Sequence, residues 1–180
     1  DLDWAVAGGG EKPAAVELSD KFPVDVAFGG GTVSVTPVMS PEQLLPDPDL
    51  WDLPRLVAMI DGAQERVRVQ LLSYEVRSYS GEYWDVLDRA LRGAAARGVD
   101  VEILVADWSK KKYKIEVLRS LAVMPHIDVR FIVVPDHADG FVPFGRVAHS
   151  KFLVVDGQHS WVGTSNWSED YFHASRNVGL

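Results

Sequence analysis

The sequence has 180 residues and a formal net charge of −8, from 18 lysines and arginines against 26 aspartates and glutamates. Hydrophobic residues make up 47% and charged residues 24%, the balance of a globular domain large enough to bury a core. The acidic excess argues against a protein that coats duplex nucleic acid, but leaves room for a small basic pocket for one phosphate. The absence of cysteine excludes disulfides, thiolate nucleophiles and cysteine-based zinc sites.

The first part of the chain is rich in glycine. Two triple-glycine runs, at 8–10 and 29–31, interrupt a stretch with few apolar residues in register. We expect residues 1–31 to be a connector or N-terminal extension, because glycine is costly to order, and residues 32–180 to form one domain. A phosphate-cradling loop is the alternative, but no strand leads into either run and no Lys-Ser/Thr follows.

Strand and helix patterns then alternate along the chain. Apolar residues at helical spacing predict helices over residues 53–60, 84–95 and 115–122. Runs of β-branched and apolar residues predict strands over residues 32–36, 66–74, 99–106 and 127–134. This alternation favours an α/β fold in which helices pack on a mixed β-sheet to form a sandwich.

A β-hairpin is predicted near the end of the chain. Two β-prone runs, 147–155 and 159–163, flank the turn signal Asp156-Gly157. A two-residue turn pairs Val155 with Gln158 and sets the register of the whole hairpin.

This register brings polar side chains together on one face. Counting back from the turn, Lys151 lies opposite Val162 and His149 lies opposite Thr164, while Asn166 falls on the same face. A neutral imidazole can attack phosphorus, a lysine can bind the phosphate oxygens, and amide and hydroxyl groups can donate hydrogen bonds to them. The alternative is an edge hairpin that carries ordinary polar residues on its solvent face.

The same residues resemble a known motif. His149-Ser150-Lys151, followed after four residues by Asp156, is similar to the HxKxxxxD motif of the phospholipase D superfamily. Gly163-Thr164-Ser165-Asn166 is similar to the G(S/T)xN element of that family. The continuation Trp167-Ser168, with Tyr171-Phe172 soon after, looks closest to the second half of the lumenal phospholipase D-like 5′ exonucleases.

The resemblance implies a phospholipase D-like fold and a metal-independent phosphodiesterase that needs no cofactor and forms a covalent phosphohistidine. His149 would be nucleophile or general acid, and Lys151 and Asn166 would hold the phosphate. Thr164 or Ser165 would assist. Asp156 belongs to the catalytic motif but would mainly organise the hairpin. The substrate would be a phospholipid or a single-stranded nucleic acid, and the protein would be secreted or lumenal.

One copy of the motif is not enough for this chemistry. In-line displacement needs a nucleophile on one side of phosphorus and an acid on the other, so the family brings two copies together. No other histidine of this sequence has a lysine two residues later. We expect the second half of a longer two-motif chain, since the sequence begins at Asp1 and Leu180 falls where a strand should begin. A symmetric homodimer is the alternative.

A further hypothesis is a non-catalytic half that is kept for assembly. It is motivated by the stretch Ser175–Val178, which lacks the carboxylate that family members commonly have after the G(S/T)xN element. The intact motif residues argue against it.

The only basic cluster of the sequence follows the strand at 99–106. It comprises Lys110, Lys111, Lys112 and Lys114. Beside Trp108 and Tyr113 it could bind a polynucleotide backbone at the end of a strand, where α/β folds often bind ligands. A solvated start of a helix is the alternative interpretation.

Overall fold

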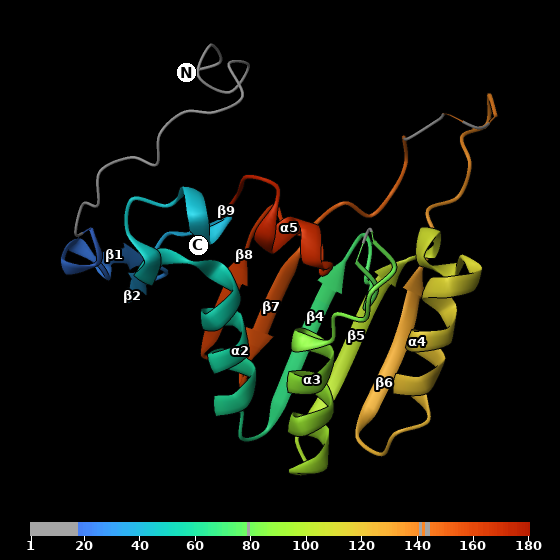
Figure 1. Cartoon of the computed structure of the whole chain (residues 1–180), viewed down its shortest axis with the longest axis horizontal. Coiled ribbons are helices and arrows are strands. Elements are labelled where there is room, and N and C mark those ends of the chain that lie inside the picture. Colours follow the sequence, from blue (N-terminus) through green and yellow to red (C-terminus); the bar gives the residue numbers. More distant parts are fainter. Residues whose placement is uncertain (1–17, 79, 141, 143–144) are drawn as a thin grey trace.

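A computed structural model describes residues 18–180 except residues 79, 141 and 143–144. Its centre is a five-stranded mixed sheet in the order β6-β5-β4-β7-β8 (Figure 1). The strands are β4 (Arg66–Leu71), β5 (Asp100–Ala106), β6 (Ile127–Ile132), β7 (Phe152–Val155) and β8 (His159–Val162). The first three are parallel, whereas β7 and β8 are antiparallel to their neighbours. The predicted α/β fold with a mixed sheet is confirmed.

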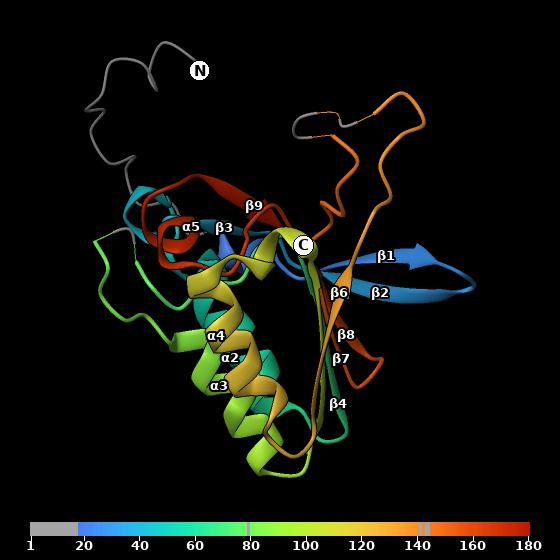
Figure 2. The ribbon, with the colours of Figure 1, turned by 90° about the vertical axis from the view of Figure 1, so that its right-hand side faces the viewer.

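Three helices pack on one face of this sheet: α2 (Asp52–Gly62), α3 (Val86–Ala96) and α4 (Lys112–Ala122) (Figure 2). All three were predicted from the apolar spacing. Gly98 follows α3 in a left-handed conformation, with φ of 91°, as expected for a glycine at a helix end. Within the part of the chain that the structure describes, no helix covers the opposite face of the sheet.

The inward side chains of the central strands form the core. In β4 the alternating residues Val67, Val69 and Leu71 face this core, and all three are at most 2% exposed. The aromatic residues Trp161 and Trp167 close the core at the end of the sheet where β7 begins, and both are also at most 2% exposed. No helix among the described residues is long and apolar enough to cross a membrane.

The remaining elements are short. Two further strand pairs are β1 (Val24–Phe28) with β2 (Gly31–Val35), and β3 (Val38–Ser40) with β9 (Asn177–Gly179). The short helices are η1 (Ser19–Lys21), η2 (Glu42–Leu44), η3 (Pro48–Leu50), η4 (Asp107–Lys110) and α5 (Glu169–His173).

The glycine-rich N-terminal region is only partly described. Residues 1–17, which include the first glycine run, lie outside the described residues. In the rest of the expected connector, residues 24–28 form strand β1, which was not predicted, and Gly29 and Gly30 make the turn into β2 with positive φ. The strand expected at 32–36 is confirmed as β2.

The register of the β7–β8 hairpin differs by one residue from the prediction. Val155 pairs with His159, so the turn contains three residues instead of two. Asp156 and Gly157 both adopt left-handed conformations, and Gln158 donates its N–H to Val155 to close the turn. A one-residue shift moves every partner to the other face of the sheet.

The shift changes the neighbours of the motif. Lys151 lies opposite Gly163, whose N–H donates to the Lys151 carbonyl at 3.2 Å, and Val162 points to the helix-free face. The expected strand at 147–155 is also shorter, since β7 begins only at Phe152. His149 therefore lies in an extended segment before the strand.

We predict that Gly163→Ala destabilises the protein by about 1–3 kcal/mol, the usual cost of overpacking a core. A Cβ at this position would overlap the buried ring of Trp161, so the ring or the backbone would have to shift. Urea unfolding measures the change. Gly62→Ala is the control, because a Cβ there meets no atom within 4 Å. Equal stability of the two variants would contradict the prediction.

Candidate active site

His149, Lys151 and Asn166 gather at one edge of the sheet. Strand β4 ends at Leu71 and β7 begins beside it, because Gln70 pairs with Phe152. Four segments meet at this edge (Figure 1). Two of them follow strands β4 and β5, one leads into β7, and one follows β8. Ligand sites of α/β folds commonly lie at such carboxyl ends of parallel strands.

His149 and Lys151 are in direct contact at this edge. Lys151 is only 4% exposed, and its Nζ donates to the His149 carbonyl at 2.6 Å and lies 3.3 Å from each ring nitrogen. Burial lowers the pKa of the Lys151 ammonium. His149 itself is exposed. The pair thus combines an imidazole open to solvent with a cation shielded from it.

Asn166 is held at the same edge by both ends of its amide. Its Oδ1 accepts a hydrogen bond from the Ser73 N–H at 3.1 Å, just after β4. Its Nδ2 donates to the hydroxyl of Tyr171 at 3.0 Å. Because an amide nitrogen carries two hydrogens, one of them remains for a further acceptor. The side chain is 3% exposed, so its orientation is fixed by packing as well.

The two hydroxyl groups between Gly163 and Asn166 have partners within the protein. Ser165 is fully buried and donates to Asp52 Oδ2 at 3.2 Å. Thr164 donates to the side chain of Asn177 at 2.9 Å and accepts from the N–H of Val178 at 3.1 Å. The structure therefore uses both hydroxyls to hold the loop, and their contact with phosphate stays a prediction.

Asp52 is a supporting residue that sequence reasoning missed. It lies in the first turn of α2, is 1% exposed, and among the described residues its Oδ1 has no hydrogen-bond partner. Burial raises the pKa of this carboxyl from its ordinary value of 3.8 to about 7. Nothing in the sequence connects Asp52 with Ser165, which comes 113 residues later.

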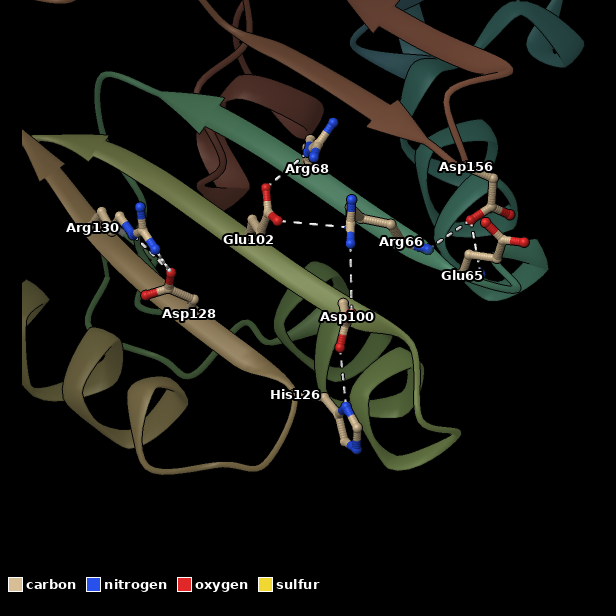
Figure 3. A network of polar contacts seen from close by, with 9 residues as sticks. All are labelled: Glu65, Arg66, Arg68, Asp100, Glu102, His126, Asp128, Arg130 and Asp156. Carbon is tan, nitrogen blue, oxygen red and sulfur yellow. Dashed lines mark hydrogen bonds and ion pairs between the residues drawn. The ribbon is translucent and has the colours of Figure 1, made fainter.

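Asp156 lies at the far end of β7, away from the other motif residues. Its carboxylate accepts three backbone hydrogen bonds, from the N–H groups of Arg66 at 2.7 Å and of Gln64 and Glu65 at 2.9 Å each. Figure 3 shows the bonds from Arg66 and Glu65. These bonds, the one from Arg66 above all, lower the pKa of Asp156. Asp156 is thus separated from the residues predicted to bind phosphate. Its hydrogen bonds hold the backbone at the start of β4, and we call this contact the Asp156 clamp.

Lys114, a member of the basic cluster of the sequence, lies beside the site in contacts that the sequence did not predict. Lys114 of α4 forms an ion pair with Glu75 and donates to the Ser73 hydroxyl at 2.8 Å. The Ser73 hydroxyl also donates to Glu75 at 3.1 Å, and the Ser73 N–H binds Asn166. Glu75 therefore brings a carboxylate near the site, although none follows Asn166 in the sequence position usual for the family.

A well-formed cavity among the described residues lies elsewhere. Its volume is about 920 Å³, and it opens between β2, α2 and β8. Asp156 and Trp161 line it, but His149, Lys151 and Asn166 do not. The shape of the surface would thus have selected a different region from the one that carries His149, Lys151 and Asn166. We base the assignment of the candidate site on the chemistry of these side chains.

The described residues contain no group of three or more His, Asp or Glu side chains placed to hold a metal ion. The residues at the site edge are instead suited to an anion, because Lys151 and the Asn166 amide donate hydrogen bonds. An oxyanion with exposed oxygens, such as a phosphodiester, fits this donor set.

Comparisons with known proteins agree on a family. Residues 56–180 match the family model described as cardiolipin synthase, PLD-like domain. The chain is 41% identical over 140 residues to phospholipase D Z of Dictyostelium discoideum, and 38% identical over 152 residues to the 5′-3′ exonuclease PLD4 of Mus musculus. These alignments cover 74% and 78% of the chain but only 33% and 30% of the relatives. The chain therefore spans about a third of the length of the curated relatives it matches.

Two solved structures share the fold. Nuc from Salmonella typhimurium aligns with a TM-score of 0.58 at 20% identity, over 81% of this chain and 80% of that one. NucT from Helicobacter pylori aligns with a TM-score of 0.60 at 22% identity, over 71% of this chain and 74% of that one. At this level of identity the likeness concerns the fold alone.

We predict that Asp52 makes the folded protein less stable as the pH rises from about 4 to about 7. The raised pKa means that the unfolded chain loses the Asp52 proton across this range while the folded chain keeps it, so stability falls, and it levels off above pH 7. Each unit of difference in pKa corresponds to about 1.4 kcal/mol. Urea unfolding at several pH values checks this for the parent and for Asp52→Asn.

The Asp52→Asn variant carries no titrating group at this position, so the difference between parent and variant isolates the effect. The difference in unfolding free energy between the parent and Asp52→Asn should change steadily between pH 4 and 7. A gap that is constant over this range would contradict the assignment.

We also predict that Asp156→Asn lowers the melting temperature. An asparagine side chain has one acceptor oxygen and would turn an NH₂ group toward N–H donors that the carboxylate now binds. Thermal unfolding measures the effect. His149→Ala is the comparison, because His149 is exposed and should change the melting temperature little. A loss as large in His149→Ala would argue against a clamp at Asp156.

Proposed function

The chain belongs to the phospholipase D superfamily, and on that premise we propose that it supplies one half of the active site of a metal-independent phosphodiester hydrolase. One observation supports this most directly: the exposed imidazole of His149 touches a buried ammonium, that of Lys151. This contact provides a nucleophile and a phosphate-binding cation side by side. Asn166, oriented at the same edge of the sheet, adds a hydrogen-bond donor.

The protein groups suit the binding of a phosphodiester before reaction. The Lys151 ammonium has three hydrogens and spends one on the His149 carbonyl, which leaves others for the non-bridging oxygens. The free hydrogen of the Asn166 amide can reach the same anion. Charge on these oxygens grows as the pentacoordinate state forms, so both contacts stabilise the transition state more than the bound substrate.

In the first step a ring nitrogen of His149 forms a bond to phosphorus, and the bond from phosphorus to the leaving oxygen breaks. An acid on the opposite side protonates that oxygen and releases an alcohol. In the second step water attacks phosphorus and the phosphorus–nitrogen bond breaks. The proton of the water passes to the former acid, which restores both catalytic groups.

The acid in this scheme cannot be His149, because it lies on the attacking side. We therefore infer a second HxKxxxxD set, contributed by another part of a longer protein or by a second copy of this chain. The length of the relatives, about three times the matched segment, supports the first source. The alternative of a non-catalytic half lacks support from the site, since the motif side chains keep the contacts that catalysis would need.

The substrate is a phospholipid or a single-stranded nucleic acid. The relatives' names include both a phospholipase D and a 5′-3′ exonuclease, so they favour neither class. The site itself recognises the shared phosphodiester.

We expect the native protein to hydrolyse bis(4-nitrophenyl) phosphate in the presence of EDTA, and His149→Ala to lower the rate by at least about 100-fold. Mass spectrometry should find one 4-nitrophenyl phosphoryl group per active chain, attached to His149. This adduct should be lost in acid and stable in base. Light scattering alongside the assay identifies the assembly that carries the activity.

The matched control is His159→Ala, which removes an exposed histidine from strand β8 and leaves the motif intact. It should retain activity and the adduct. Equal rates for the two variants, or an activity that EDTA abolishes, would contradict the proposal.

A further inference from the structure

A basic and aromatic surface lies beside the site, on η4 and the first turn of α4. We call Trp108, Lys110, Lys111 and Tyr113 the α4 patch. Trp108 is 37% exposed and Tyr113 is 53% exposed, and both lysines are exposed as well. Two cations and two accessible rings thus lie within six consecutive residues.

The charge of the α4 patch is not neutralised by ion pairs. Within the described residues, neither Lys110 nor Lys111 forms a salt bridge, and the first turn of α4 contains no acidic residue. The cations of the helix-free sheet face differ: Arg66, Arg68 and Arg130 all pair with carboxylates (Figure 3). In a chain with a net charge of −8, Lys110 and Lys111 thus carry charge that no salt bridge among the described residues offsets, although η4 begins with the acidic Asp107.

Two residues next to the members of the α4 patch, Lys114 and Ser109, connect it to the site. Lys114, one residue beyond it, donates to the hydroxyl of Ser73, whose N–H donates to Asn166. Ser109, between Trp108 and Lys110, is fully buried and donates to the Leu72 carbonyl at 3.2 Å. The α4 patch therefore adjoins the phosphate-binding residues and is held at a fixed position relative to them.

The composition of the α4 patch suits a single-stranded nucleic acid. Lysines bind successive phosphates of a strand, and exposed rings stack on unpaired bases. A bilayer would instead need an exposed apolar surface near the site. The exposed apolar side chains that cluster most clearly, Val24, Val26 and Phe28, lie on the β1–β2 hairpin, beside the cavity at β8 and not beside α4.

We propose that the α4 patch binds single-stranded nucleic acid next to the scissile phosphodiester, with Lys110 and Lys111 on neighbouring phosphates and Tyr113 and Trp108 against bases. The inference rests on the proposed function for the position of the scissile bond. It narrows the substrate to a polynucleotide and gives the specificity to residues outside the HxKxxxxD motif.

The test measures binding of a short fluorescein-labelled oligothymidylate by fluorescence anisotropy at several salt concentrations. The double variant Lys110→Ala/Lys111→Ala should bind at least about tenfold more weakly. Its slope of log affinity against log salt should be shallower by about 1.4, because each phosphate contact on a single strand contributes about 0.7. Lys21→Ala/Arg119→Ala removes the same charge elsewhere, partly from the far end of α4, and should bind like the parent.

A second variant tests the stacking. Tyr113→Ala should weaken binding on the order of tenfold without changing the salt slope, since stacking releases no counterions. Tyr113→Phe keeps the ring and should restore the affinity. Circular dichroism melting of each variant verifies that the fold is intact.

Two results would overturn the inference. The first is equal loss of affinity in the patch variant and in the charge-matched control. The second is binding to phosphatidylserine vesicles while the oligonucleotide does not bind, which would assign the surface to lipid. Binding requires no turnover, and gel analysis checks that the oligonucleotide stays intact. The result is therefore independent of the bis(4-nitrophenyl) phosphate assay, and either proposal can fail while the other stands.

Discussion

The antiparallel pairing of β4 with β7 is the interaction on which the rest of the structure depends. It joins the parallel half of the sheet to the hairpin that carries the motif, and residues 67–70 pair with residues 152–155. At one end of this pairing Asp156 binds three N–H groups that lead into β4. At the other end Ser73, just past β4, binds Asn166. A change of register here would separate the reactive groups, so the pairing serves the site as much as the sheet.

Several polar side chains are buried beneath the site, where burial is costly unless hydrogen bonds compensate for lost water. Lys151, Asn166 and Ser165 each have partners. The partner of Lys151 is the nearby His149, whereas Ser73 and Asp52, which bind Asn166 and Ser165, come from distant segments. Asp52 is a partial exception, because one of its oxygens has no hydrogen-bond partner in the described part of the chain and burial raises its pKa to about 7. Such local costs are typical of functional sites, where position matters more than stability.

Charge is arranged differently on two parts of the surface. On the helix-free face of the sheet, arginines form salt bridges with carboxylates (Figure 3). One example is Arg68 on β4 with Glu102 on the neighbouring β5, at 2.8 Å. In the α4 patch, Lys110 and Lys111 form no salt bridge among the described residues, and Lys110 instead lies over the ring of Phe131. Net charge therefore describes this protein poorly, because an acidic chain can still carry a local group of basic side chains beside its candidate active site.

The sequence by itself determined the elements and the motif, because apolar periodicity and the HxKxxxxD spacing are local patterns. All three helices, the strands of the main sheet and the family followed from it. The register of the hairpin did not follow from the sequence. The turn contains a third residue, Gln158, because Asp156 and Gly157 both adopt left-handed conformations. Only the tertiary structure decided that Asp52 supports Ser165, that Glu75 and Lys114 flank Asn166, and that Asp156 acts at the opposite end of β7. These contacts join segments far apart in the chain, and their geometry depends on how helices and strands pack, which no local pattern records.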